Sequence, residues 1–298
     1  MDHRGSLPRL ESAMRDMDWR RVKVVPLDLA QPWPTHARDE LGYPDYIINY
    51  ASQSHVDRSI IDPIPFVQNN VNLMLNMLQY AVALPDLQVF LQISTDEVYG
   101  PCAGAPHVEW SPIVPSNPYS ASKAAQEALA ISYWRTYNLP LVLTNTMNLI
   151  GEYQDDEKFV PMVIKSVLSN RIVTIHTGID GKPGSRCWIH ARNLADGVLW
   201  LLLHSGVSVY TPMQGIEPKP ARWNIVGEEL DNLTLAQRIA TVLSRPLKYS
   251  LVDFHSTRPG HDARYALDGT ALAEAGWTAP VSLDTAIKAI TRWPEYSD

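Results

Sequence analysis

The sequence predicts an α/β fold in which helices cover a largely parallel sheet. Short apolar runs alternate with longer amphipathic segments through the first half of the chain, as in βαβ units. Hydrophobic residues make up 45% of the 298 residues and charged residues 19%, which is ordinary for a globular protein. Such a length buries one substantial core or two unequal ones. We therefore expect a parallel-sheet domain over residues 1–150 and a smaller, mainly α+β domain over residues 151–298.

Apolar periodicity predicts each element of the first domain in turn. The expected strands are residues 22–26, 45–50, 87–94 and 139–145. The expected helices between them are residues 65–83 and 118–137. Beyond Gly151 the pattern loosens, and we expect one helix near 160–169 and short strands near Val173 and Trp223. Proline and glycine gather at 178–184 and 211–220, which predicts long loops there.

Charge, hydropathy and cysteine content exclude several classes of protein. The formal charge is −7, with no basic run, so we expect no nucleic-acid partner. The longest apolar run, residues 198–203, is too short to span a bilayer, so no membrane partner is expected. Cys102 and Cys187 lack metal-ligand spacing, and no metal site is expected. Two cysteines and no signal-like apolar stretch at the start favour a reducing cytoplasm.

Two short motifs carry the chemistry of the sequence. Residues 94–97, Ser-Thr-Asp-Glu, follow a predicted buried strand, and Tyr119 and Lys123 lie four apart on the next predicted helix. The carboxyl ends of parallel strands border the ligand crevice of α/β sheets. Side chains four apart share a helix face, so the Lys123 ammonium could hold the Tyr119 phenol toward its ionised form. Taken alone, each motif also has a purely structural interpretation. Residues 94–97 could be an acidic turn after a strand, and Tyr119 and Lys123 could lie on a solvated helix face.

Together and in this order, the motifs resemble the extended short-chain dehydrogenase/reductase family, and within it the dTDP-glucose 4,6-dehydratases. Residues 51–59, 144–153, 258–268 and 276–277 resemble further segments of that family, so the resemblance covers nearly the whole chain. It implies a Rossmann-like parallel sheet with a smaller substrate domain, the two partly interleaved. It also implies the NAD-dependent conversion of a nucleotide-linked hexose, with dTDP-glucose expected, to a 4-keto-6-deoxy sugar by a homodimer.

The resemblance implies a role for each residue in the two motifs. Tyr119 would take the C4 hydroxyl proton as the hydride leaves, and Thr95 would hydrogen-bond the same oxygen. Lys123 would keep the pKa of the phenol low. Glu97 would remove the C5 proton, and Asp96 would protonate the departing C6 hydroxyl. Asp96 must then stay protonated near neutral pH, which requires burial or the like charge of Glu97.

Binding residues are implied in the same way. The expected NAD contacts are Asp28, Leu29, Ala51, Ser52, Asn70, Ser94, Tyr119 and Lys123. The expected nucleotide-sugar contacts are His55, Asn148, Lys158, Arg186, Arg258 and His261. Arg186 would pair with the pyrophosphate as a planar fork. For His55 and Arg58, a cap on the following segment is an equally open interpretation.

Several positions depart from the family pattern. Gln53 stands where glutamate is usual, residues 149–150 replace Asn-Tyr, Glu152 replaces proline and Cys187 replaces aspartate. The family also opens with a strand and a Gly-x-x-Gly-x-x-Gly turn, and we expect no such motif in this sequence. Relative to the family, about 30 residues of strand, turn, helix and strand are expected to be missing, an N-terminal truncation of the sheet.

That departure has two possible origins and several expected consequences. A late start or a truncated chain is one origin, and a natural derivative that no longer binds NAD normally is the other. Residues 22–26 would be separated from the rest of the sheet, and residues 46–50 would border an exposed apolar edge. We expect the 298 residues to bind NAD weakly or not at all, because backbone N–H groups of that turn hold the pyrophosphate.

Two other functions stay open. One is a nucleotide-sugar 4-epimerase or decarboxylase of the same superfamily, disfavoured because epimerases need no acid–base pair for C5 and C6. The other is a non-catalytic binding or scaffold protein that kept the fold and lost its cofactor. The absent opening turn supports that alternative, whereas the intact residues 95–97, Tyr119 and Lys123 oppose it.

Overall fold

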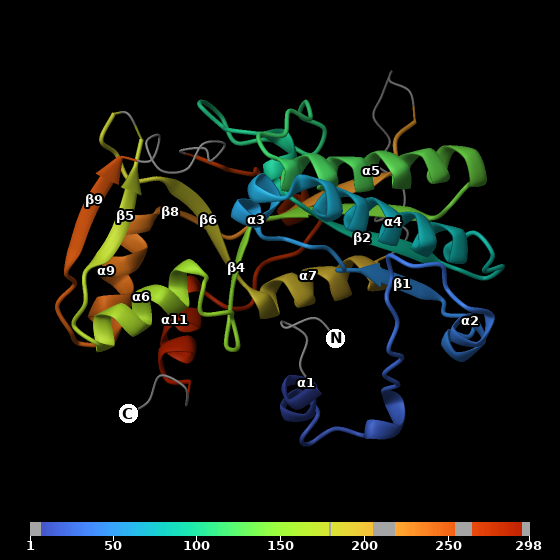
Figure 1. The fold of residues 1–298 in the computed structure, drawn as a ribbon, viewed down its shortest axis with the longest axis horizontal. Helices are drawn as coiled ribbons and strands as arrows, with labels where there is room; N and C mark the ends of the chain where they lie inside the picture. Colours follow the sequence, from blue (N-terminus) through green and yellow to red (C-terminus); the bar gives the residue numbers. More distant parts are fainter. Residues whose placement is uncertain (1–6, 179, 205–217, 254–263, 294–298) are drawn as a thin grey trace.

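A four-stranded parallel sheet forms the centre of the larger part of the molecule (Figure 1). The computed structural model describes residues 7–178, 180–204, 218–253 and 264–293. The sheet has the order β1-β2-β3-β7, with β1 (Tyr46–Asn49), β2 (Val89–Thr95), β3 (Leu141–Thr146) and β7 (Ala221–Ile225). Every neighbouring pair is parallel, which confirms the predicted α/β class.

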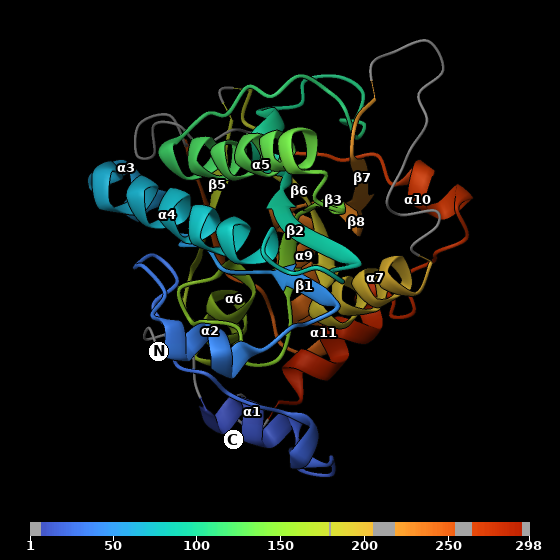
Figure 2. The same cartoon turned by 90° about the vertical axis from the view of Figure 1, so that its right-hand side faces the viewer.

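Helices cover both faces of this sheet. Helices α4 (Pro63–Ala81) and α5 (Pro118–Tyr137) lie on one face, and α7 (Ala191–Leu203) lies on the other (Figure 2). Alternate residues of β2 reach the two cores: Phe90 joins the core under α4 and α5, and Leu91 joins the core under α7. Because both faces are covered, all residues of β2 and β3 are buried, as in sheets of this kind.

The smaller part combines two small sheets with three helices. The sheets are β4 (Asn148–Ile150), β6 (Ser185–His190) and β8 (Glu228–Asp231), and β5 (Val173–Thr177) with β9 (Tyr249–Asp253). The helices are α6 (Phe159–Leu168), α9 (Asn232–Val242) and α11 (Leu283–Thr291), which share a third apolar core with β4, β5 and β6. The chain passes between the two parts more than once, and the linear boundary at residue 150 stays a prediction.

Shorter elements connect these layers. They are α1 (Leu7–Ala13), η1 (Trp19–Arg21), α2 (Thr35–Leu41), α3 (Val56–Ile61), η2 (Asp96–Tyr99) and α10 (Thr270–Glu274). Within the described ranges, no helix combines the length and the apolar character needed to cross a bilayer.

β7 is joined to the rest of the larger part by a buried ion pair as well as by backbone hydrogen bonds. Arg222 of β7 donates to the Glu127 carboxylate of α5 at 2.6 Å and to the Tyr99 hydroxyl at 3.0 Å. The side chains of Arg222 and Glu127 are both fully buried. Removing either partner would leave an uncompensated charge in the interior, so the pair locks β7 and α5 together.

The prediction of a strand at residues 22–26 is wrong. The segment has no regular secondary structure and no strand partner among the described residues. A cavity of ≈380 Å³, lined by Val25, Leu27, Tyr46 and Ile47 among others, separates it from β1. A strand exists only where a neighbour supplies hydrogen bonds to its backbone, and no described strand pairs with residues 22–26. β1 is accordingly an edge of the sheet as described, with Tyr46 and Ile48 partly exposed.

Candidate active site

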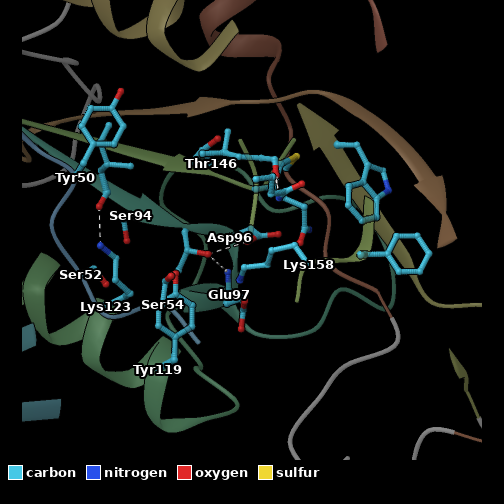
Figure 3. Close-up of a pocket in the computed structure, with 18 residues that line it drawn as sticks. Tyr50, Ser52, Ser54, Ser94, Asp96, Glu97, Tyr119, Lys123, Thr146 and Lys158 are labelled. Atoms are coloured by element: carbon cyan, nitrogen blue, oxygen red, sulfur yellow. Dashed lines mark hydrogen bonds between the residues drawn. The ribbon is translucent and has the colours of Figure 1, made fainter. Parts of the chain in front are cut away.

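A cavity of ≈390 Å³ opens at the carboxyl end of β2 (Figure 3). The predicted site residues that line it are Ser52, Ser94, Thr95, Asp96, Glu97, Tyr119, Lys123, Asn148 and Lys158. β2 ends at Thr95, and the 3-10 turn η2 begins at the next residue. The Thr95 hydroxyl caps that turn by accepting from the Glu97 N–H at 3.4 Å. The strand end and its cap therefore direct both carboxyl groups to the cavity.

Asp96 carries a carboxyl group that the surrounding protein only half satisfies. The Thr95 hydroxyl donates to its Oδ1 at 2.9 Å, whereas its Oδ2 is buried and has no hydrogen-bond partner among the described residues. Burial raises the pKa of Asp96 to about 6. An orphaned buried oxygen on a carboxyl with a raised pKa suits a group that holds a proton and passes it to a ligand.

Glu97 lies beside it and is also shifted toward neutrality. Burial, and next the charge of Asp96, raise the pKa of Glu97 to about 7. The Asn117 amide opposes this rise by donating from Nδ2 to Oε2 of Glu97 at 3.1 Å. Two interacting carboxyls with raised pKa values titrate as a pair, so they can hold one proton between them near pH 7. That shared state is what an acid–base pair requires.

Tyr119 and Lys123 enter the cavity from the first turns of α5. The Lys123 ammonium donates to the Ile93 carbonyl at 2.7 Å, a bond drawn in Figure 3. It also donates to Oε1 of Gln126 at 2.8 Å. Burial lowers the pKa of Lys123 to about 8, and burial followed by the charge of Glu97 raises the pKa of the Tyr119 phenol well above its usual range. The Lys123 ammonium is thus held by β2 and Gln126, and its expected lowering of the Tyr119 phenol pKa stays a prediction.

Sequence reasoning missed a network of buried amides beneath Lys123. The Oε1 of Gln126 accepts a hydrogen bond from the Lys123 ammonium, and its Nε2 donates to the Asn70 backbone carbonyl at 2.9 Å. Gln92 donates to Gln126 at 3.3 Å and accepts from Asn49 at 2.7 Å. All four amide side chains are almost fully buried. Gln92 could have signalled this network, since it interrupts the apolar run of a strand predicted to be buried.

The expected NAD contacts fall along two cavities. Asp28, Leu29, Ala51 and Ser52 line a second cavity of ≈750 Å³, and Ser52 lines the first as well. Asn70 hydrogen-bonds the backbone of Gln53, which lines the second cavity. Its Oδ1 accepts from the Gln53 N–H, and its Nδ2 donates to the Gln53 carbonyl. The Ser94 hydroxyl is buried without a hydrogen-bond partner in the described chain, beside Lys123. The expected NAD contacts thus line or border these two neighbouring cavities, and their role in binding the dinucleotide stays a prediction.

Three glycines do have the spacing Gly-x-x-Gly-x-x-Gly, at 178, 181 and 184. They follow β5 and precede β6, so they join strand to strand instead of opening a helix. Their N–H groups are already used: Gly178 donates to the Lys182 carbonyl, Gly181 to the Gly178 carbonyl and Gly184 to the His176 carbonyl. This turn therefore cannot cradle a pyrophosphate in the way that the family's opening turn does.

The expected substrate contacts are spread more widely. Asn148 and Lys158 line the first cavity. His55 begins α3, where its Nδ1 accepts from the Arg58 N–H at 3.3 Å, so the capping interpretation is confirmed for His55. Arg186 lies with its guanidinium 4.7 Å from the ring centre of Tyr265. Arg258 and His261 lie outside the described residues.

Arg186 is close enough to the paired carboxyls to influence them electrostatically. Its charge lowers the pKa of both Asp96 and Glu97 against the larger effect of burial. Its Nη1 also donates to its neighbour's carbonyl, that of Ser185, at 2.7 Å. Arg186 thus brings positive charge near the two carboxyl groups, although it is not among the residues that line the cavity.

Comparison with known proteins adds to this geometry. Residues 7–211 match the NAD dependent epimerase/dehydratase family. The chain belongs to this family. A "Probable dTDP-glucose 4,6-dehydratase" from Sinorhizobium fredii is 37% identical over 292 residues, 92% of this chain and 79% of that protein. The dTDP-glucose 4,6-dehydratase of Xanthomonas campestris is 34% identical, over 84% of this chain and 72% of its own length.

Solved structures of the family have the same fold. The dTDP-glucose 4,6-dehydratase DesIV from Streptomyces venezuelae, solved with NAD and TYD bound, superposes with a TM-score of 0.81 at 30% identity. That match covers 96% of this chain and 83% of DesIV. A Thermus thermophilus UDP-glucose 4-epimerase in complex with NAD, 21% identical with a TM-score of 0.74, shares the fold. The resemblance drawn from the two motifs is confirmed, and with it the Rossmann-like class.

Proposed function

We propose that this protein is an NAD-dependent nucleotide-sugar 4,6-dehydratase that converts an NDP-hexose, with dTDP-glucose as first candidate, to the 4-keto-6-deoxy sugar. The carrying observation is that Asp96 and Glu97 share one cavity with Tyr119 and Lys123, and that one oxygen of Asp96 is buried and unpaired. An epimerase exchanges hydride at C4 and has no use for a second pair of proton-transfer groups. The carboxyl pair therefore favours dehydration over epimerisation or decarboxylation.

In the proposed reaction, Tyr119, Glu97 and Asp96 each transfer one proton. NAD, when bound, supplies the acceptor for the C4 hydride and returns a hydride to C6. Tyr119, as the phenolate that the positive charge of the bound nicotinamide would favour, takes the C4 hydroxyl proton while Thr95 hydrogen-bonds the same oxygen. Glu97 removes the C5 proton made acidic by the C4 ketone, and Asp96 gives its proton to the C6 hydroxyl, which leaves as water. Once C6 has received its hydride, Glu97 would return the proton to C5. The assignment of the two carboxyls follows the family motif, because their pKa values of about 6 and about 7 allow either to hold the shared proton.

Incubation of the purified protein with dTDP-glucose and NAD tests the proposal directly. A 4-keto sugar would be detected by its alkali-induced absorbance, and the loss of the C6 hydroxyl by mass spectrometry. A C4 epimer without loss of water would instead indicate an epimerase. Neither product, at NAD concentrations shown by calorimetry to saturate the protein, would favour the non-catalytic derivative. Two further predictions, a homodimer and a cytoplasmic location, need sedimentation and cell fractionation.

Tyr119→Phe should abolish hydride transfer and leave the fold intact. A proton-transfer group of this kind contributes about 10²–10⁴ in rate. The ring would keep its edge-to-face packing on Phe66, 6.3 Å between centres, so we expect little change in thermal stability. NADH absorbance under single-turnover conditions measures the loss. Tyr137→Phe, at the exposed end of the same helix, is the control. A Tyr119→Phe rate within a factor of two of wild type would make Tyr119 structural.

Arg186→Ala should weaken nucleotide-sugar binding more than NAD binding. A diphosphate loses a bidentate, charge-assisted partner, which corresponds to roughly 10- to 100-fold in affinity. Calorimetry with dTDP, and separately with NAD, measures both. Arg238→Ala provides the control, because Arg238 pairs with Glu228 at 2.7 Å on the surface and, unlike Arg186, does not influence the pKa of Asp96 or Glu97. Equal weakening of the two ligands would place Arg186 elsewhere.

A further inference from the structure

Asn117 stands at the junction between the carboxyl pair and helix α5. It is the N-cap of α5, with extended backbone angles of −150° and 166°. Its Oδ1 accepts from the Ser120 N–H at 2.9 Å, and its own N–H donates to the Ser120 hydroxyl at 3.1 Å, a complete capping box. Its Nδ2 donates to Oε2 of Glu97 at 3.1 Å. One side chain, 7% exposed, thus bonds both the helix start and a carboxyl of the cavity.

The two bonds fix the orientation of the amide. Ser120 presents an N–H, which only the oxygen of the amide can accept, so the NH₂ group must face Glu97. A donor at that place favours the ionised carboxylate, because a proton on Oε2 would oppose the N–H. Oε1 is left without that restraint. Glu97 is therefore held by one oxygen, with the other available to a reacting C–H.

We infer that Asn117 is a positioning residue that fixes the Glu97 carboxylate, keeps it in its basic form and couples its place to that of Tyr119. The inference rests on the proposed role of Glu97 as the base. Tyr119 lies two residues after Asn117, and its N–H donates to the Ser59 hydroxyl at 3.1 Å, so the same helix start sets its position. The side-chain amide of Asn117 therefore does two things: it caps the start of α5 and it hydrogen-bonds Glu97.

The charge environment shows why such a donor is needed. The titratable and charged groups that influence Glu97 are Asp96 from η2, Tyr119 from α5, Lys158 before α6 and Arg186 from β6. Burial and Asp96 raise the pKa of Glu97, while Asn117 has the largest lowering effect, ahead of Arg186 and Lys158. Removing the Asn117 donor should therefore raise this pKa, so that Glu97 ionises only at higher pH.

Asn117→Ser separates the two functions of the side chain. Serine is as good an N-cap as asparagine but is too short to donate to Glu97, so thermal stability should stay near wild type. The Glu97 carboxyl should titrate about one pH unit higher, the equivalent of one hydrogen bond to a charged group. Asn117→Asp keeps the N-cap and the shape of the side chain but replaces the NH₂ group that donates to Glu97 by a carboxylate oxygen. The pKa of Glu97 should therefore rise further than in Asn117→Ser.

Infrared difference titration of the protein without substrate measures this pKa, with the Glu97→Gln spectrum identifying the band. Ser120→Ala is the matched control, since it weakens the capping box but leaves the Asn117–Glu97 bond; thermal stability should fall and the band should not move. With dTDP-glucose and NAD, the acidic limb of the kcat profile of Asn117→Ser should shift upward in parallel.

An unchanged band in both Asn117→Ser and Asn117→Asp would overturn the inference, as would equal shifts in Ser120→Ala. This outcome is distinct from failure of the proposed function, which would show as no 4-keto sugar from the wild-type protein at saturating NAD, whatever the infrared titration gives.

Discussion

Glu97→Gln should stop elimination while still allowing oxidation at C4. The amide keeps the size of the side chain and can still accept from Asn117, but it cannot take the C5 proton. A general base contributes about 10²–10⁴ in rate, so product formation should fall by that factor. A 4-keto-hexose that retains its C6 hydroxyl, or NADH, should accumulate. Mass spectrometry of the sugar and absorbance of the nicotinamide distinguish these states.

The pH dependence of the wild-type rate should agree with this assignment. Burial raises the pKa of Glu97 to about 7, and only its ionised form is a base, so elimination should slow as the pH falls below about 7. Asp96→Asn is the companion variant, which should retain C5 proton exchange with solvent deuterium and lose water departure. Normal 4-keto-6-deoxy product from Glu97→Gln would remove Glu97 from the mechanism.

Residues 1–298 by themselves should bind NAD weakly or not at all. The two cavities that share Ser52 are lined by residues expected to contact the ends of the dinucleotide. The family's glycine-rich opening turn, whose N–H groups would hold the pyrophosphate, is not part of residues 1–298. Losing several charge-assisted hydrogen bonds, at roughly 1.5–3 kcal/mol each, should cost orders of magnitude in affinity. Calorimetry with NAD measures this directly. The open edge at β1 should also promote self-association, measured by sedimentation.

A chimera provides the control for the prediction on NAD. The opening strand, glycine-rich turn, helix and strand of the Xanthomonas campestris relative, placed ahead of Met1, should recover NAD binding. The same chimera with the turn glycines replaced by alanine should not, because the added Cβ atoms block the close approach of the phosphates. Copurification of the unextended chain with stoichiometric NAD would show that the turn is dispensable.

The sequence predicted the regular elements well where local signals and burial agreed. α5 has the predicted ends, residues 118 and 137, because Asn117 caps it, Pro118 suits its first turn and Asn138 takes the left-handed conformation after it. β2 and β3 were recognisable as continuous apolar runs. The strand at 22–26 failed because its apolar residues lack a neighbouring strand, which no local pattern reveals.

The sequence predicted which residues line the cavity better than it predicted the hydrogen bonds between them. Residues 95–97, Tyr119 and Lys123 all line one cavity, as strand-end and helix-face arguments require. Asn117 and Gln126 were missed, since a cap and a helix-face glutamine look the same in sequence whether or not they contact a catalytic group. The direction of the Lys123 ammonium depends on the Ile93 carbonyl and Gln126, which only the fold brings together.

The position of β7 at the far side of the large sheet bears on how the protein acquires its structure during synthesis. β3 has a free edge until residues 221–225 have left the ribosome, and Glu127 has no Arg222 beside it until the same moment. A nascent chain ending near residue 150 would therefore carry an apolar edge and an unneutralised interior carboxylate, conditions that favour chaperone binding over early folding. The catalytic cavity, although built mostly from residues before 150, should form only after three quarters of the chain has been translated.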